Sequence, residues 1–130
     1  MWLVALALIL LGGCAGVAVN VETLQGQGYQ RFPVVRPTPG GGWHEEPKYE
    51  LWVQESRADK RTVRLCLVPK ISGAGYHWAV TVNVENRPAW SYESGQLDGL
   101  PFIRQRIDCT VSGPLPEGPL SYGVSYVYRD

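Results

Sequence analysis

The feature that most constrains the fold is the strict alternation of residue types in segment 77–85, HWAVTVNVE. The large apolar side chains recur at every second position: Trp78, Val80, Val82 and Val84. The residues between them are small or polar. Alternation over this length is typical of a β-strand with one buried face and one face in water. The segment therefore predicts an antiparallel sheet that covers a core on one side only.

Five further runs rich in β-branched and aromatic residues predict strands at 49–54, 61–68, 89–92, 102–109 and 120–128. Proline, glycine and polar clusters separate the runs, and no helical period appears among them. Six strands at a spacing of about ten residues indicate an all-β fold, a small antiparallel β-sandwich or a barrel. Trp78 lies between Cys66 and Cys109. This spacing loosely resembles that of immunoglobulin domains, so we expect an Ig-like sandwich only at the level of topology class.

The N-terminal segment predicts export. Residues 2–11, WLVALALILL, are all apolar, and Gly12-Gly13-Cys14 follow directly. A run of about ten apolar residues has the length of a signal-peptide core and is shorter than the ~20 residues that span a bilayer. Leu11-Gly12-Gly13-Cys14 resembles the lipobox of bacterial lipoproteins. The resemblance covers this short segment and implies a processing route, not a fold.

In lipoproteins of this class, a diacylglycerol is attached to the cysteine thiol and the signal is cut just before that cysteine. The new amino group is often acylated, for example with palmitate. The resemblance thus implies that residues 1–13 are a signal peptide and that Cys14 is the lipidated N-terminus. Ala15 rather than an acidic residue follows, which favours the periplasmic side of the outer membrane if the source is Gram-negative. The alternative is an uncleaved transmembrane helix, because residues 2–19 carry no charge, but Gly12, Gly13 and Gly16 interrupt them.

The cysteine count agrees with export. Three cysteines leave one unpaired in an oxidising compartment, and lipidation of Cys14 accounts for it. Cys66 and Cys109 are then expected to form a disulfide, either between sheets or between strands. Two buried free thiols are the alternative. For the loop that this bridge closes, the chain-entropy model gives a stabilisation of about 4 kcal/mol.

Residues 14–47 are predicted to be a lipidated, Pro/Gly-rich tether, followed by the β-sandwich domain at 48–130. Pro33, Pro37, Pro39 and the triplet at 40–42 disfavour helices and long strands. Only the run 29–35 has the composition of an edge strand.

No motif for catalysis, metal or cofactor binding emerges. His44-Glu45-Glu46 lacks the second histidine of a zinc protease motif, and the remaining histidine, His77, has no neighbouring ligand. Cys66 and Cys109 are not in a CxxC arrangement. Twelve basic and twelve acidic side chains balance, so we expect no nucleic-acid partner. We therefore expect neither a metal nor a cofactor.

The aromatic side chains raise a question about binding. Trp90 and Tyr92 share one face of a short run, and Tyr126 and Tyr128 share one face of the last strand. Each pair either forms an exposed platform for a sugar or peptide, or covers the core. Trp43 and Trp52 are also kept in the mature chain, without an assigned role.

These observations favour a non-enzymatic binding or assembly module of the cell envelope, held to the membrane by its lipid. Its partner is expected to be another envelope protein or a wall polymer. The alternative is a cell-wall hydrolase, or an inhibitor of one that acts through a rigid loop such as 112–119.

Overall fold

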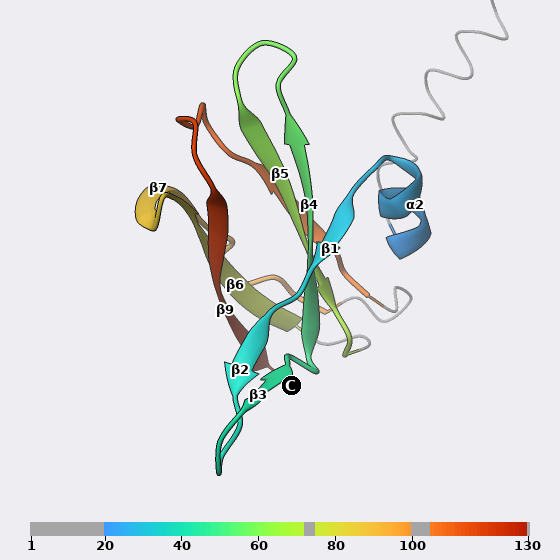
Figure 1. The fold of residues 1–130 in the computed structure, drawn as a ribbon. Coiled ribbons are helices and arrows are strands. Elements are labelled where there is room, and N and C mark those ends of the chain that lie inside the picture. The colour runs from blue at the N-terminus through green and yellow to red at the C-terminus, as the bar shows by residue number, and fades with distance from the viewer. Residues whose placement is uncertain (1–19, 72–74, 100–104, 130) are drawn as a thin grey trace, which may run out of the picture.

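The computed structural model describes residues 20–71, 75–99 and 105–129 of the chain. Within these residues the chain forms one short helix and nine strands (Figure 1). In chain order they are α2 (Val21–Gly26), β1 (Gln30–Phe32), β2 (Val35–Pro37), β3 (Trp43–Glu45), β4 (Tyr49–Ser56), β5 (Thr62–Pro69), β6 (Gly75–Val84), β7 (Arg87–Glu93), β8 (Asp108–Val111) and β9 (Leu120–Arg129).

Two antiparallel sheets form the two layers of a β-sandwich. One has the strand order β1-β4-β5-β8 and the other has the order β7-β6-β9, while β2 and β3 form a separate hairpin. An immunoglobulin constant domain also has four and three strands in its two sheets. The all-β, antiparallel character expected from the sequence is confirmed.

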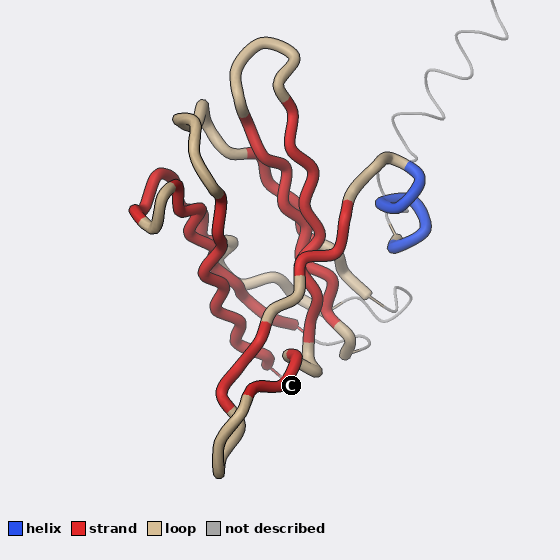
Figure 2. Tube along the Cα trace, in the orientation of Figure 1, coloured by secondary structure: helices blue, strands red, loops and turns tan. Residues whose placement is uncertain are grey.

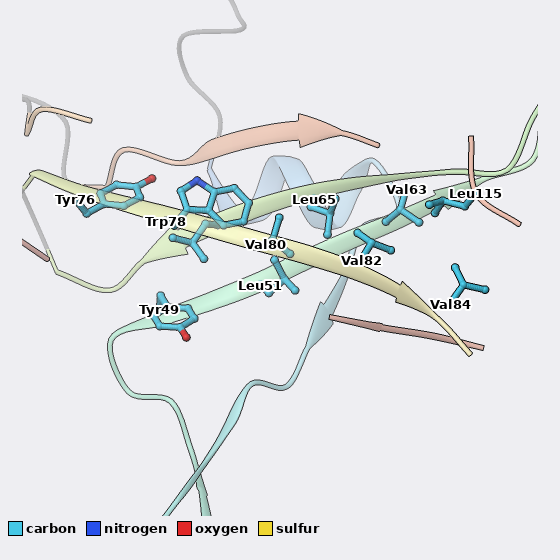
Figure 3. Close-up of a cluster of buried hydrophobic side chains, with 11 residues drawn as sticks. Tyr49, Leu51, Val63, Leu65, Tyr76, Trp78, Val80, Val82, Val84 and Leu115 are labelled. Atoms are coloured by element: carbon cyan, nitrogen blue, oxygen red, sulfur yellow. The ribbon is translucent and has the colours of Figure 1, made fainter. Parts of the chain in front are cut away.

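The core lies between the two sheets and follows the predicted alternation. In β6 every second residue is buried, and Trp78 and Val82 are fully covered. Leu51, Leu65 and Leu67 from the opposite sheet pack against them (Figure 3). A buried aromatic or leucine side chain of this kind typically contributes about 2–5 kcal/mol. The contact between these two faces is therefore the main source of stability.

A second apolar cluster lies on the outer face of the β4–β5 sheet. Helix α2 covers this face, with Leu24 and Tyr29 packed on Trp52, Cys66 and Val68. The helix begins at the N-cap residue Asn20, whose side chain accepts a hydrogen bond from the backbone N–H of Thr23 at 2.9 Å. From Leu65 to Val68 both faces of β5 are therefore buried.

Cys66 and Cys109 form the expected disulfide. They lie directly opposite each other on β5 and β8, so the bridge joins neighbouring strands of one sheet. Cys66 is fully buried under α2, whereas Cys109 is exposed. Because β8 is the last strand of its sheet, the bridge fixes this edge to the centre of the sheet.

The expectation that residues 14–47 form no helix is wrong for the part that the structure describes, because α2 lies at Val21–Gly26, whereas the strands there are only three residues long. The run 29–35, left open by its sequence, provides β1, whose residues Gln30–Phe32 pair with Leu51–Val53 of β4. Prolines and glycines did not prevent this, because Pro33 lies between strands and the glycines at 40–42 form a turn. Cys14 and the apolar segment before it lie outside the described residues, as do residues 102–104 of the predicted strand 102–109.

Candidate functional site

The hairpin β2–β3 projects from the sandwich (Figure 2). Among the described residues, its Trp43 is the most exposed of the large apolar side chains. Its tip is the glycine triplet 40–42, in which all three residues have positive φ. Thr38 closes the turn, since its N–H donates to the carbonyl of Gly42 at 3.0 Å and its own carbonyl accepts from Gly41 at 2.9 Å. Glycine adopts this backbone without strain, so the turn is locally encoded.

One face of the hairpin carries three apolar side chains and one carboxylate. Pro37 lies opposite Trp43, and Val35 lies opposite Glu45, so these four side chains share a face. Trp43 is 71% exposed and Val35 is 51% exposed. An indole of this exposure contributes nothing to the core. We define Val35, Pro37 and Trp43 as the hairpin face.

Polar contacts fix the orientation of the hairpin. Arg36, on its other face, donates from Nη2 to the Tyr49 hydroxyl at 2.5 Å and to the carbonyl of Val124 at 2.9 Å. Its Nε lies 3.4 Å from Glu46 Oε2. Arg31 of β1 forms an ion pair with Glu45. Burial raises the pKa of Tyr49 despite the nearby guanidinium of Arg36, so its hydroxyl stays protonated at neutral pH.

The predicted aromatic pair Trp90 and Tyr92 comes together on β7. Their rings are parallel within 5°, with centroids 6.3 Å apart. The Tyr92 hydroxyl and Trp78 Nε1 both donate to Asp108 Oδ2, at 2.8 and 2.9 Å. Burial, followed by the Asp108 carboxylate, raises the pKa of Tyr92 to about 12. Tyr92 therefore links β7 to β8 as part of the sandwich.

Trp90 is half-buried beside Tyr92 and lines a shallow hollow of about 350 Å³ with Thr81 and Ser91. The remaining predicted pair behaves similarly. Tyr126 is half-buried and its ring packs on those of Tyr76 and Tyr49, at centroid distances of 5.4 and 4.8 Å. Tyr128 is 37% exposed. Trp90, Tyr92 and Tyr126 therefore all pack against the core, and Tyr128 is the one exposed ring of the two pairs.

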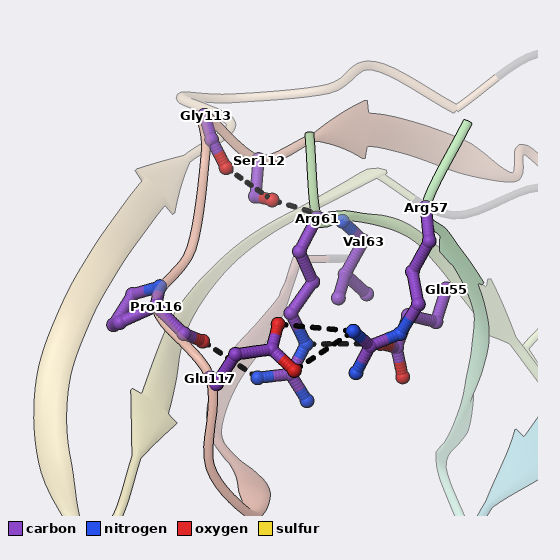
Figure 4. Close-up of polar contacts among 8 residues, drawn as sticks. All are labelled: Glu55, Arg57, Arg61, Val63, Ser112, Gly113, Pro116 and Glu117. Carbon is purple, nitrogen blue, oxygen red and sulfur yellow. Dashed lines mark hydrogen bonds and ion pairs between the residues drawn. The ribbon is translucent and has the colours of Figure 1, made fainter. Parts of the chain in front are cut away.

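The loop 112–119 is held by an ion cluster at one end of the sandwich (Figure 4). Arg57 donates from Nη1 to both carboxylate oxygens of Glu117, at 2.8 and 2.9 Å. Arg61 donates to Glu55 at 2.9 Å and to the carbonyl of Pro116 at 2.6 Å. The hydrogen bond from Arg57 lowers the pKa of Glu117. Glu117 therefore stays ionised, which is unsuitable for a general acid.

In the described part of the chain, no three His, Cys, Asp or Glu side chains are close enough to hold a metal ion. None of the helices there has the length and apolar character needed to cross a bilayer. His44 is exposed on β3, where its Nδ1 lies 2.9 Å from the Thr38 hydroxyl. Its position is in a strand rather than in the expected loop.

Comparison of the chain with protein-family models, with curated proteins and with solved structures found no match. The hairpin face is the feature that sequence reasoning missed. The sequence pattern that could have predicted it is a tryptophan directly after three glycines, which follows the valine pair at 34–35. Such a pattern fits an exposed hairpin, but the surrounding prolines indicated a tether instead.

Proposed function

We propose that this protein is a lipid-anchored envelope lipoprotein whose β-sandwich binds a partner through the hairpin face and carries out no catalysis itself. The observation that supports this most directly is the exposure of Trp43 on an element that is otherwise firmly held. Tryptophan is strongly enriched among the residues that dominate binding energy at protein interfaces. Because the hairpin backbone that carries the indole is already held in place, binding costs little backbone ordering.

The anchor follows from the lipobox at Leu11–Cys14. Asn20, where α2 begins, lies six residues after Cys14. Six residues of extended chain reach at most about 20 Å. In the proposal the domain therefore stands close to the membrane, and the tether is much shorter than the 34 residues expected from sequence.

The position of α2 also bears on the kind of partner. The extended run through β1 and β2 separates α2 from the hairpin tip (Figure 1). A lipid placed just before α2 thus leaves Trp43 remote from the attachment point. We infer that the hairpin face meets another envelope protein rather than the bilayer, with wall polymer as the alternative partner.

The experiment is a pull-down from envelope extracts with the intact lipidated protein and four variants. Trp43→Ala and Val35→Ala are expected to lose the partner, with Trp43→Ala weakening binding about 30-fold, or roughly 2 kcal/mol. Val111→Ala is the matched control for Val35→Ala, because Val111 is 49% exposed on β8. Retention of the partner by Trp43→Ala overturns the proposal. Cys14→Ser tests the anchor separately, as described below.

The second candidate function is inhibition of a wall hydrolase through loop 112–119. The observation in its favour is that this loop is rigidly held, with Leu115 buried and Ser112 bonded to Val63 through both backbone and side chain. Glu117, 71% exposed in its side chain, lies on that loop. This candidate is favoured if Glu117→Ala abolishes inhibition of the hydrolase while Trp43→Ala leaves the inhibition intact.

We also propose that the fold belongs to the Ig-like class expected from the sequence, in the sense of a sandwich with sheets of four and three strands. What supports it is the pair of facing antiparallel sheets. The bridge within one sheet is a departure from the immunoglobulin pattern, in which the disulfide joins the two sheets.

A further inference from the structure

A hollow lies on the side of the sandwich where β1 and β9 are the outer strands of their sheets. Its volume is about 320 Å³, at the lower end of the ~300–1,000 Å³ that is usual for small-molecule sites. Phe32 of β1 packs edge-on against Tyr122 of β9, with ring centroids 4.8 Å apart, so the two sheets meet beside it. The hollow is lined by Gly28, Gln30, Val53, Gln54, Glu55 and Tyr122.

Two residues at the hollow are polar although they occupy core-facing positions of their strands. Gln30 shares a face of β1 with Phe32, which packs against the core. Glu55 shares a face of β4 with Leu51 and Val53, which also belong to the core. The inward face of both strands therefore changes from apolar to polar where the hollow begins.

Several polar groups at the hollow are available to a ligand. Within the described part of the chain, neither the Gln30 amide nor the Tyr122 hydroxyl has a hydrogen-bond partner. Gln54 donates from Nε2 to the carbonyl of Gln27 at 2.5 Å and keeps its Oε1 as an acceptor. Burial, followed by the charge of Glu55, raises the pKa of Tyr122, so its hydroxyl stays protonated and can donate.

The charges beside the hollow compensate one another. Glu55 Oε2 lies 2.9 Å from the Nε atoms of both Arg57 and Arg61, and Arg57 also binds Glu117 (Figure 4). A cationic ligand gains little from Glu55, because two guanidinium groups already lie beside this carboxylate. An anionic ligand is repelled by the same carboxylate. The hollow therefore favours a neutral ligand that hydrogen-bonds.

We propose that this hollow binds a neutral sugar residue of a polysaccharide. Sugar hydroxyls both donate and accept, which matches the Gln30 amide, the Tyr122 hydroxyl and the second oxygen of Glu55. Val53 is half-buried there and offers an apolar contact to the C–H groups of a sugar ring. An apolar peptide side chain of similar size leaves the polar groups of the hollow unpaired, which is costly.

The sugar site goes beyond the function proposed for the hairpin face. The hollow shares no residue with Val35, Pro37 or Trp43. A protein partner on the hairpin face and a glycan in the hollow can thus be bound at the same time, and either site can fail without the other.

The test is an NMR titration of the ¹⁵N-labelled full chain in detergent with three trisaccharides. The neutral probes are the trisaccharide of N-acetylglucosamine and maltotriose, and the anionic probe is trigalacturonic acid. Saturable shifts of the amide signals of Gln30, Val53 and Tyr122 are expected with at least one neutral probe, and the tighter of the two identifies the kind of polymer. The anionic probe is expected to bind at least about 10-fold more weakly than that probe, because it meets Glu55.

Two variants remove one polar group each. Tyr122→Phe keeps the ring on Phe32 and loses only the hydroxyl, so the fold is preserved. It and Gln30→Ala are each expected to weaken sugar binding about fivefold, the usual effect of one neutral hydrogen bond. The matched controls are Tyr29→Phe, whose ring lies under α2 on the other face of the sheet, and Gln25→Ala on α2 itself. Both controls are expected to bind as the wild type does.

Three results overturn the proposal. One is that neither neutral trisaccharide shifts the signals of the hollow. Another is that Tyr122→Phe and Gln30→Ala bind sugar as tightly as their controls. The third is that Trp43→Ala abolishes sugar binding, which places the sugar on the hairpin face instead. Loss of the protein partner from Trp43→Ala with unchanged sugar binding is the result expected if both sites exist.

Discussion

Leu24→Ala tests whether the N-terminal segment belongs to the folded unit. Leu24 is 2% exposed and packs in the cluster with Tyr29, Trp52, Cys66 and Val68. Removing a buried leucine side chain typically costs about 2–5 kcal/mol. The cluster is covered by a single short helix that can partly settle into the cavity, so we expect the lower part of this range, about 2–3 kcal/mol. At roughly 4–8 °C per kcal/mol, Tm should fall by about 8–24 °C.

The assay is thermal and urea unfolding of the full chain, followed by tryptophan fluorescence. Trp52 lies in the affected cluster, so its emission reports local loosening as well as global unfolding. Gln25→Ala is the control, because Gln25 is exposed on the same helix and alanine favours the helix equally well. If Leu24→Ala and Gln25→Ala unfold at the same temperature, α2 does not stabilise the domain and residues 20–29 are a tether after all.

Three further outcomes are expected. Replacing Cys66 and Cys109 together by alanine should lower the free energy of unfolding by up to about 4 kcal/mol, and equal urea midpoints for oxidised and reduced wild type contradict this. The free energy of unfolding should fall between about pH 10 and 12, because tyrosines of the unfolded chain ionise near pH 10 while burial holds the pKa of Tyr92 at about 12 in the fold. In Tyr92→Phe this free energy should fall less steeply with pH, and a slope equal to that of the wild type refutes the raised pKa of Tyr92. Cys14→Ser should leave an uncleaved precursor without lipid by intact mass, and a mature species identical to the wild type excludes the lipoprotein assignment.

Local patterns predicted the parts of the fold that depend on neighbouring residues in the chain. The alternation in 77–85 gave the buried face of β6 because one side of a strand meets the core along its whole length. The cysteine count predicted the disulfide because the lipidation proposed for Cys14 leaves Cys66 and Cys109 as a pair. Neither pattern depends on contacts between distant segments.

Distant contacts account for what was missed. Cys66 and Val68 are buried because α2 returns onto the outer face of their sheet, about 40 residues away in sequence. The hairpin is fixed because Arg36 reaches Val124, 88 residues further along the chain. No local pattern in the sequence around α2 or around Arg36 predicts these contacts. The role of Tyr92 was missed for the same reason, because its hydroxyl donates to Asp108, which lies in the other sheet.

Site-specific photo-cross-linking tests most directly whether the hairpin face binds an envelope component. A photoreactive amino acid replaces Trp43 in the full chain, and cells are irradiated before the membranes are isolated. The account predicts a specific adduct with an envelope component from position 43 and none from position 111, a β8 site where the native valine is 49% exposed. No adduct from position 43, or the same adduct from both positions, contradicts it.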